Sequence, residues 1–372
     1  MARPATPTDS MRPRILIVGI YAPYNHLKSA EHYYDEFLSL IHTVGITYDE
    51  SIFLKLRNTD KNTFFTKGKL QEVADFCNEH RIDEVIISEV LTPLQERNLE
   101  DFFNCVVYDR TKLILEIFRN AAISSESKVQ IEMAEIEFLK TRVFGKGVHL
   151  AQQAGYIGGK GPGETLAEVA KQEFGEKLRQ AKKKLDTLQR ARDTQRKQRL
   201  ESKIPLVCLI GYTNAGKSSL INRLTKSDVL AEDKLFATLD TTTRELYLGK
   251  DKNILVSDTV GFISELPPKL IEAFKSTLDE LRFASLLVHV VDASNPAWPD
   301  HLKVVHQILE DLGVQDKSMV YAFNKVDKLS DEELEKLKHD VQEINPHVLI
   351  NTRSKEGVAD LVTFMAAHNF KA

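Results

Sequence analysis

The sequence contains few cysteines. Cys77, Cys105 and Cys208 are its only three among 372 residues, and no cluster of cysteine and histidine with metal-ligand spacing surrounds them. An odd number of widely spaced cysteines does not form a disulfide framework, and an isolated cysteine does not hold zinc. We therefore expect three reduced core residues in a protein of a reducing compartment.

Long hydrophobic runs are absent as well. The longest apolar stretch, at 284–293, is far shorter than the roughly 20 residues that a membrane helix needs. The N-terminal stretch 1–13 lacks the apolar core of a secretory signal. We expect no membrane span, a flexible tail at 1–13, and a cytoplasmic monomer.

Charge is nearly balanced overall but unevenly placed. The net charge is −4, yet Lys171–Lys203 holds twelve basic and five acidic residues, so this segment is +7 and the remainder is −11. One concentrated basic element in an acidic chain suggests contact with a polyanion such as RNA. A solvated helix face is the alternative, and composition leaves both open.

Strand-like and helix-like patterns alternate in two regions, 14–123 and 204–372. Such alternation predicts parallel sheets covered by helices, with an N-terminal α/β domain and a C-terminal doubly wound α/β domain. In the first region we expect strands at 14–20, 46–56, 83–89 and 105–109 and helices at 29–41, 68–79 and 93–103. Thr92 and Pro93 suit the N-cap and the first position of the last of these helices.

The pattern changes between the two regions, at 124–203. Apolar residues at helical spacing predict two helices, 128–142 and 164–200, which we expect to form an antiparallel hairpin. Between them, 155–163 contains five glycines and cannot be regular structure. Its backbone could approach a ligand closely, or the stretch could be a flexible connector.

A phosphate-binding loop follows the first strand of the C-terminal region. Its residues are Gly211, Tyr212, Thr213, Asn214, Ala215, Gly216, Lys217 and Ser218, between a hydrophobic strand and a helix. In this context the glycines turn backbone N–H groups toward the phosphates, the lysine reaches the β- and γ-phosphates, and the serine ligates Mg²⁺.

Two further segments complete a nucleotide site. The first is Asp258, Thr259, Val260 and Gly261, at the end of a strand, where the carboxylate can hold hydrated Mg²⁺ and the glycine N–H can meet the γ-phosphate. The second is Asn324, Lys325, Val326 and Asp327, at the end of another strand. The carboxylate of Asp327 can accept from N1–H and the amino group of guanine. Adenine would leave that carboxylate unpaired, so we expect strong preference for GTP over ATP.

A switch segment is expected at Phe236–Arg244, between the loop and Asp258. A threonine there can complete Mg²⁺ coordination and sense the γ-phosphate, and chemistry alone does not choose among Thr238, Thr241, Thr242 and Thr243. Phe262 stands where Ras-like enzymes carry the glutamine that orients water, so the catalytic group is unknown and slow intrinsic hydrolysis is expected.

From about Arg14 onward the sequence resembles the HflX family of the Obg–HflX GTPases. Beyond the GTPase motifs, blocks at 67–73, 91–100, 108–118, 128–138 and 158–165 are similar to successive family blocks in family order. The resemblance implies a GTPase that binds GTP with Mg²⁺ and releases GDP. It also implies binding to the large (50S) ribosomal subunit, with the hairpin and the glycine-rich loop directed at ribosomal RNA. Some members split stalled 70S ribosomes, and ATP binding by the N-terminal domain is left open.

The resemblance also implies roles for individual residues. It selects Thr238, within Phe236, Ala237, Thr238, Leu239 and Asp240, as the Mg²⁺ ligand that accompanies Ser218. Asn214 matches the loop asparagine of potassium-activated GTPases, so K⁺ joins Mg²⁺ as an expected cofactor. The resemblance assigns base recognition to Asn324, Lys325 and Asp327, and Asn351, Thr352 and Arg353 take the place of the second guanine contact.

Several positions depart from the family pattern. Thr241 replaces a proline, Asn351 and Thr352 replace a Ser-Ala pair, and 170–172 lack the usual acidic and arginine pair.

The leading hypothesis is an enzyme that uses GTP hydrolysis to time either its own release from the ribosome or the splitting of the ribosome. The alternative is a ribosome- or RNA-binding module in which GTP is a ligand switch with little turnover. A third hypothesis, an ATP-driven RNA remodeller, is disfavoured by Asp327.

Overall fold

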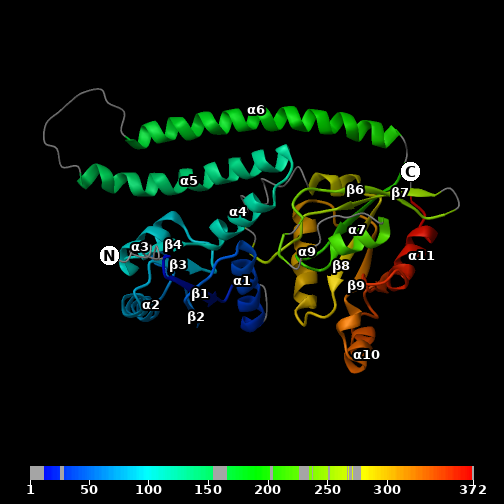
Figure 1. Cartoon of the computed structure of the whole chain (residues 1–372), viewed down its shortest axis with the longest axis horizontal. Helices are drawn as coiled ribbons and strands as arrows, with labels where there is room; N and C mark the ends of the chain where they lie inside the picture. The colour runs from blue at the N-terminus through cyan, green and yellow to red at the C-terminus, as the bar shows by residue number, and fades with distance from the viewer. Residues whose placement is uncertain are drawn as a thin grey trace, which may run out of the picture.

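Two sheet-containing units lie side by side, and two long helices run along one side of them (Figure 1). We call these parts the N-terminal unit, the C-terminal unit and the hairpin. The computed structural model describes residues 12–25, 29–153, 166–201, 204–225, 234–236, 238–249, 252–265, 267, 270 and 278–370. It describes side chains throughout these ranges except at 143–153, 166–170 and 192–201.

The N-terminal unit contains a four-stranded parallel sheet in the order β2-β1-β3-β4. Its strands are β1 (Ile15–Tyr21), β2 (Glu50–Lys55), β3 (Glu84–Ile87) and β4 (Val106–Tyr108). Its helices are α1 (Ala30–Val44), α2 (Lys67–His80), α3 (Pro93–Phe103) and α4 (Arg110–Ala121). The predicted alternation is confirmed, and Thr92 caps α3 in a capping box with Gln95.

The hairpin consists of α5 (Ser125–Gln153) and α6 (Leu166–Glu201), which lie side by side and run in opposite directions (Figure 1). Helix α5 is longer than the 128–142 expected from periodicity. On the described part of α6, the apolar residues at helical spacing are less exposed than the charged residues, and Ala181 is buried. The glycine-rich stretch 155–163 lies outside the described residues, as do residues 1–11 of the expected tail.

The C-terminal unit contains a six-stranded sheet in the order β10-β9-β8-β5-β7-β6. The strands are β5 (Leu206–Ile210), β6 (Thr243–Tyr247), β7 (Asn253–Asp258), β8 (Leu286–Asp292), β9 (Met319–Asn324) and β10 (His347–Leu349). The helices are α7 (Lys217–Thr225), α9 (Trp298–Asp311), α10 (Asp331–Asp340) and α11 (Ala359–Ala367), with 3₁₀ turns η1 (Asp279–Phe283), η2 (Val326–Lys328) and η3 (Glu356–Val358).

This strand order places the expected site at one edge of the sheet. Strands β5, β7, β8, β9 and β10 are parallel, so their carboxyl ends meet at the same edge, where open α/β sheets bind ligands. Strand β6 is antiparallel to β7, which periodicity did not predict. The segment before β6 therefore lies at the carboxyl end of β7, where Thr238 contacts Ser218 of the phosphate-binding loop.

One apolar cluster, here called the shared core, contains residues of both units and of the hairpin. Buried side chains of the N-terminal unit and hairpin, including Phe118 and Ile131, pack in the same cluster as Phe236, Leu239 and Phe262. Cys77, Cys105 and Cys208 are buried and free, as expected. Within the described part of the chain, no helix combines the length and apolar character needed to cross a membrane.

Candidate functional site: a phosphate-binding cleft

The loop at 211–218 has a backbone that only its two glycines permit. Gly211 has φ 144° and Gly216 has φ 96°, in the region that L side chains avoid. A Cβ at Gly211 would lie 2.2 Å from the carbonyl oxygen of Val290, and one at Gly216 would lie 2.2 Å from Nδ2 of Asn324. The loop is therefore packed closely against β8 and β9, and it borders a cleft.

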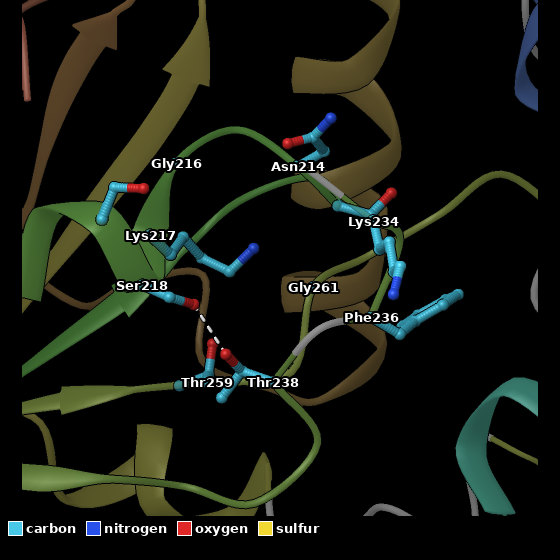
Figure 2. A pocket seen from close by; sticks show the side chains of 11 residues that line it. Asn214, Gly216, Lys217, Ser218, Lys234, Phe236, Thr238, Thr259 and Gly261 are labelled. Atoms are coloured by element: carbon cyan, nitrogen blue, oxygen red, sulfur yellow. Dashed lines mark hydrogen bonds between the residues drawn. The ribbon is translucent and has the colours of Figure 1, made fainter. Parts of the chain in front are cut away.

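Lys217 reaches back along this loop. Its Nζ donates to the carbonyl oxygens of Gly211 at 3.1 Å and Tyr212 at 2.9 Å, and the residue is 6% exposed. Burial lowers the pKa of Lys217 to about 8, although the Asp258 carboxylate acts in the opposite direction. Figure 2 shows its side chain directed into the cleft between Asn214 and Gly261.

Three oxygen-bearing side chains from three segments meet at Ser218. Its Oγ lies 2.6 Å from Oγ1 of Thr238, the contact dashed in Figure 2, and donates to Oδ2 of Asp258 at 2.8 Å. The other Asp258 oxygen, Oδ1, is buried without a hydrogen-bond partner among the described residues. Burial raises the pKa of Asp258, while Lys217 opposes the shift. Hydroxyl and carboxylate oxygens are the donors that Mg²⁺ prefers, so these residues fit that ion.

The rest of the segment around Thr238 turns away from the cleft. The Phe236 ring borders the cleft but packs edge-on against Phe118 of α4, with ring centroids 4.7 Å apart. Leu239 is buried in the shared core, and the Asp240 carboxylate binds the start of α5. The structure therefore does not bring Leu239 or Asp240 to the phosphate-binding loop, and Ala237 lies outside the described residues.

The segment after β7 pairs with the phosphate-binding loop through its backbone. Thr213 N donates to Phe262 O at 2.7 Å, and Phe262 N donates to Gly211 O at 3.1 Å. Gly261 lies so close to the loop that a Cβ there would be 2.9 Å from Cα of Thr213. The Thr259 hydroxyl donates to Leu209 O, and Val260 is buried in the core. Phe262 is 3% exposed and presents no polar group to the cleft.

At the end of β9, two of the expected base-binding side chains hold the loop. Nδ2 of Asn324 donates to Ala215 O at 2.9 Å, and this asparagine is fully buried. Lys325 has φ 65°, and its Nζ donates to Asn214 O at 2.8 Å and to Oδ2 of Asp292 at 2.7 Å. These contacts position the loop rather than present groups to a base, and Val326 follows in η2.

Asp327 faces the loop at 351–353. Its Oδ2 lies 3.1 Å from a guanidinium nitrogen of Arg353, whose backbone N–H donates to Oδ1 of Asn351 at 2.8 Å. Arg223 of α7 donates to Thr352 O at 2.9 Å and to Arg353 O at 2.6 Å. The structure thus brings Asp327 and all three expected residues of that loop together.

Sequence reasoning missed three contributors to this site. Asp292 ends β8 and neutralises Lys325, and its place at the end of a buried strand was the signal for it. Arg223 and Lys234, the latter at the rim of the cleft, follow no motif and needed the fold.

The Tyr212 side chain, expected among the nucleotide contacts, points away from the cleft. Its hydroxyl contacts Glu36 of α1 and lies 2.6 Å from Oγ of Ser264. Its ring stacks on His301, with centroids 3.8 Å apart. Tyr212 therefore joins the phosphate-binding loop to the N-terminal unit.

Comparisons with known families and proteins match most of the chain. The family described as GTP-binding GTPase N-terminal matches residues 31–119, GTP-binding GTPase Middle Region matches 121–199, and 50S ribosome-binding GTPase matches 206–325. The chain is 41% identical to GTPase HflX of Caldanaerobacter subterraneus subsp. tengcongensis, over 85% of this chain and 72% of that protein. It is 38% identical to GTPase HflX of Escherichia coli (strain K12), over 80% of this chain and 70% of that protein.

Among solved structures, the crystal structure of the SsGBP and GDP complex is similar over 95% of this chain and 99% of that chain. The sequence identity is 21% and the TM-score is 0.48. This likeness in shape is modest, and the family assignment depends on the sequence relatives.

Proposed function

The chain belongs to the HflX family of GTPases and hydrolyses GTP, and from that premise we propose that hydrolysis occurs in the 211–218 cleft with Mg²⁺ and serves the large ribosomal subunit. The observation that supports the site is the meeting of Ser218, Thr238 and Asp258 beside the buried Lys217.

In this proposal each segment of the cleft has one task. The loop Gly211–Ser218 surrounds the β-phosphate with N–H groups, and Lys217 places its ammonium against the β- and γ-phosphates. Asp258–Gly261 senses the γ-phosphate. Asp327, with the loop at 351–353, selects guanine, while Asn324 and Lys325 keep the phosphate-binding loop in place.

Ser218 and Thr238 would hold Mg²⁺ directly, and Asp258 would hold it through water. When bound, the ion neutralises charge on the β- and γ-phosphate oxygens. The orphaned Oδ1 of Asp258 supports this assignment because a buried acceptor without a partner is otherwise unfavourable.

Slow intrinsic turnover follows from Phe262. Its buried ring cannot orient water, so a cation or a partner must supply the positioning group. We propose that K⁺ near Asn214 is one such group and the large ribosomal subunit the other. Slow turnover without them is what the ligand-switch alternative also predicts, which makes stimulated turnover the deciding quantity.

The ribosomal partner is supported by the basic helix α6. Lys182, Lys183 and Lys184 are all exposed, and the family matched at 206–325 is described as 50S ribosome-binding. We propose that the chain divides into a tail at 1–13, an N-terminal α/β domain at 14–123, the helical hairpin at 124–203 and a GTPase domain at 204–372. In this proposal the hairpin contacts ribosomal RNA. The protein acts on the ribosome as a cytoplasmic monomer, and this action includes splitting the ribosome.

GTP turnover measured with and without 50S subunits, in KCl and in NaCl, tests this function. We expect stimulation by the subunits and higher rates in KCl. Absence of stimulation by either would favour the ligand-switch alternative.

A further inference from the structure

The carboxylate of Asp240, two residues beyond Thr238, is bound by the start of the hairpin. Its Oδ2 accepts from the backbone N–H groups of Ile123 at 2.8 Å and Ser124 at 3.0 Å. Its Oδ1 accepts from the Ser127 hydroxyl at 2.5 Å. Hydrogen bonds to an ionised acceptor are the strong ones, and three of them converge here from residues more than a hundred positions away in sequence.

The partner of Asp240 is a well-defined helix start. Ser127 N donates to the Ser124 hydroxyl at 3.0 Å, and Lys128 N donates to Ser124 O at 3.1 Å, which opens α5. Ser127 is 3% exposed. A carboxylate in front of a helix N-terminus also interacts favourably with the helix dipole. Asp240 therefore attaches the segment that contains Thr238 to the N-terminus of α5 through hydrogen bonds.

The residues next to Asp240 transmit this attachment to Thr238. Leu239 is 1% exposed and packs in the shared core with Phe118 and Ile131. Phe236, on the other side of Thr238, packs on Phe118, and Leu235 N donates to the Thr43 hydroxyl at 3.2 Å. The N-terminal unit and hairpin thus hold the segment on both sides of Thr238, whose hydroxyl is directed at Ser218 (Figure 2).

We propose that Ser127 and the N-terminus of α5 are positioning groups that act through Asp240 to hold Thr238 at the magnesium and GTP site. Docking of the hairpin onto Asp240 and binding of Mg²⁺–GTP then stabilise each other. This inference rests on the proposed role of Thr238 as a magnesium ligand. Coupling between two sites is reciprocal: what the hairpin adds to GTP affinity, Mg²⁺–GTP adds to docking of α5. The hairpin, which the proposed function directs at RNA, is thereby linked to the nucleotide.

The test compares Ser127→Ala with Thr141→Ala in the full-length protein. Thr141 is the matched control because it lies on the same helix and its hydroxyl donates to a residue of that helix, to Phe138 O at 2.8 Å. Affinity for a non-hydrolysable GTP analogue is measured in Mg²⁺ and in EDTA. We expect Ser127→Ala to weaken binding about fivefold in Mg²⁺ and not in EDTA, at the lower end of typical coupling factors. Ser127→Thr, which keeps the hydroxyl, restores the affinity.

Amide hydrogen exchange at 123–130 gives a readout independent of turnover. We expect slower exchange with Mg²⁺ and the GTP analogue than with GDP, and a smaller difference in Ser127→Ala. Equal behaviour of Ser127→Ala and Thr141→Ala in both measurements would overturn the inference. Wild-type protein that shows no Mg²⁺-dependent gain in affinity would instead overturn the proposed role of Thr238.

Discussion

At the scale of single residues, burial sets the protonation of the groups around the phosphate-binding loop. His301, stacked on Tyr212, is 8% exposed, and burial lowers its pKa to about 4, although Asp292 and Asp300 oppose the shift. His301 is therefore neutral at pH 7. Burial likewise lowers the pKa of Lys217, but only to about 8. Lys217 is therefore mostly protonated at pH 7, as its proposed contact with phosphates requires.

The depressed pKa of His301 predicts acid sensitivity. In the unfolded chain a histidine protonates near pH 6.5, whereas folded His301 protonates near pH 4, so lowering the pH through this window favours unfolding. We expect this residue to remove about 2 kcal/mol from the free energy of unfolding between pH 7 and pH 5. His301→Phe keeps a ring on Tyr212 and should reduce that loss, as urea unfolding at the two pH values would show. The same pH dependence in both proteins would contradict the assignment.

Residues whose tasks are local were predictable from the sequence, and residues with distant partners were not. Gly211, Gly216 and Lys217 belong to one short sequence motif, and their spacing within it predicts the geometry of the loop. Asp240 was expected at the nucleotide, but its partners at 123–127 become neighbours only in the fold. The Asn324 side chain was likewise assigned to the base, because nothing in its motif indicates the Ala215 carbonyl.

At the scale of elements, a buried polar network joins α1 and α4 to the phosphate-binding loop. Arg110 of α4 is fully buried and forms an ion pair with Glu36 of α1, which also accepts from Tyr212. Arg110 donates to Ser264 O at 2.9 Å, and Ser264 N donates to the Tyr212 hydroxyl at 2.7 Å. The network thus connects the phosphate-binding loop and the segment after β7 to the N-terminal unit.

Breaking this network should destabilise the whole chain. Arg110→Met leaves the buried Glu36 without its counter-charge, and loss of one partner of a buried pair costs about 3 to 5 kcal/mol. Arg119→Met is the matched control, because Arg119 lies on the same helix with its side chain 58% exposed, where an ion pair contributes less than about 1 kcal/mol. Urea unfolding measures both, and equal losses would show that the network adds nothing.

The elements themselves were largely predictable. Alternation of strand and helix patterns identified both parallel sheets because burial imposes those periods. The reversed strand β6 was not predicted, since its direction depends on pairing with β7 rather than on its own residues. The extension of α5 to Gln153 was missed because its apolar periodicity fades beyond Arg142.

At the scale of the whole molecule, charge and chemistry are separated. Helix α6, which contains most of the basic segment 171–203, runs along both units (Figure 1). The rest of the chain, which contains the cleft, has a net charge of −11. The start of the hairpin contacts Asp240, two residues beyond Thr238, which lines the cleft. This arrangement suits a protein whose RNA contacts and nucleotide site are distinct but linked.

The proposed RNA contact predicts a change in salt dependence. Replacing Lys182, Lys183 and Lys184 with glutamine should weaken co-sedimentation with 50S subunits and lower the slope of log affinity against log salt by about two to three. Three exposed lysines outside the hairpin, Lys61, Lys67 and Lys336, serve as the control set with the same loss of charge. An unchanged slope in the hairpin variant would mean that its lysines only face solvent.

We propose that Asp327 makes the cleft at 211–218 select a guanine nucleotide. Calorimetric titration of wild-type protein and Asp327→Asn with GTP, XTP and ATP in the presence of Mg²⁺ tests it most directly. The wild type should bind GTP with the same affinity when ATP is present in excess, and the variant should prefer XTP because its amide exchanges an acceptor for a donor. Displacement of GTP by ATP from the wild type, or an unchanged guanine preference in the variant, would contradict this assignment of Asp327.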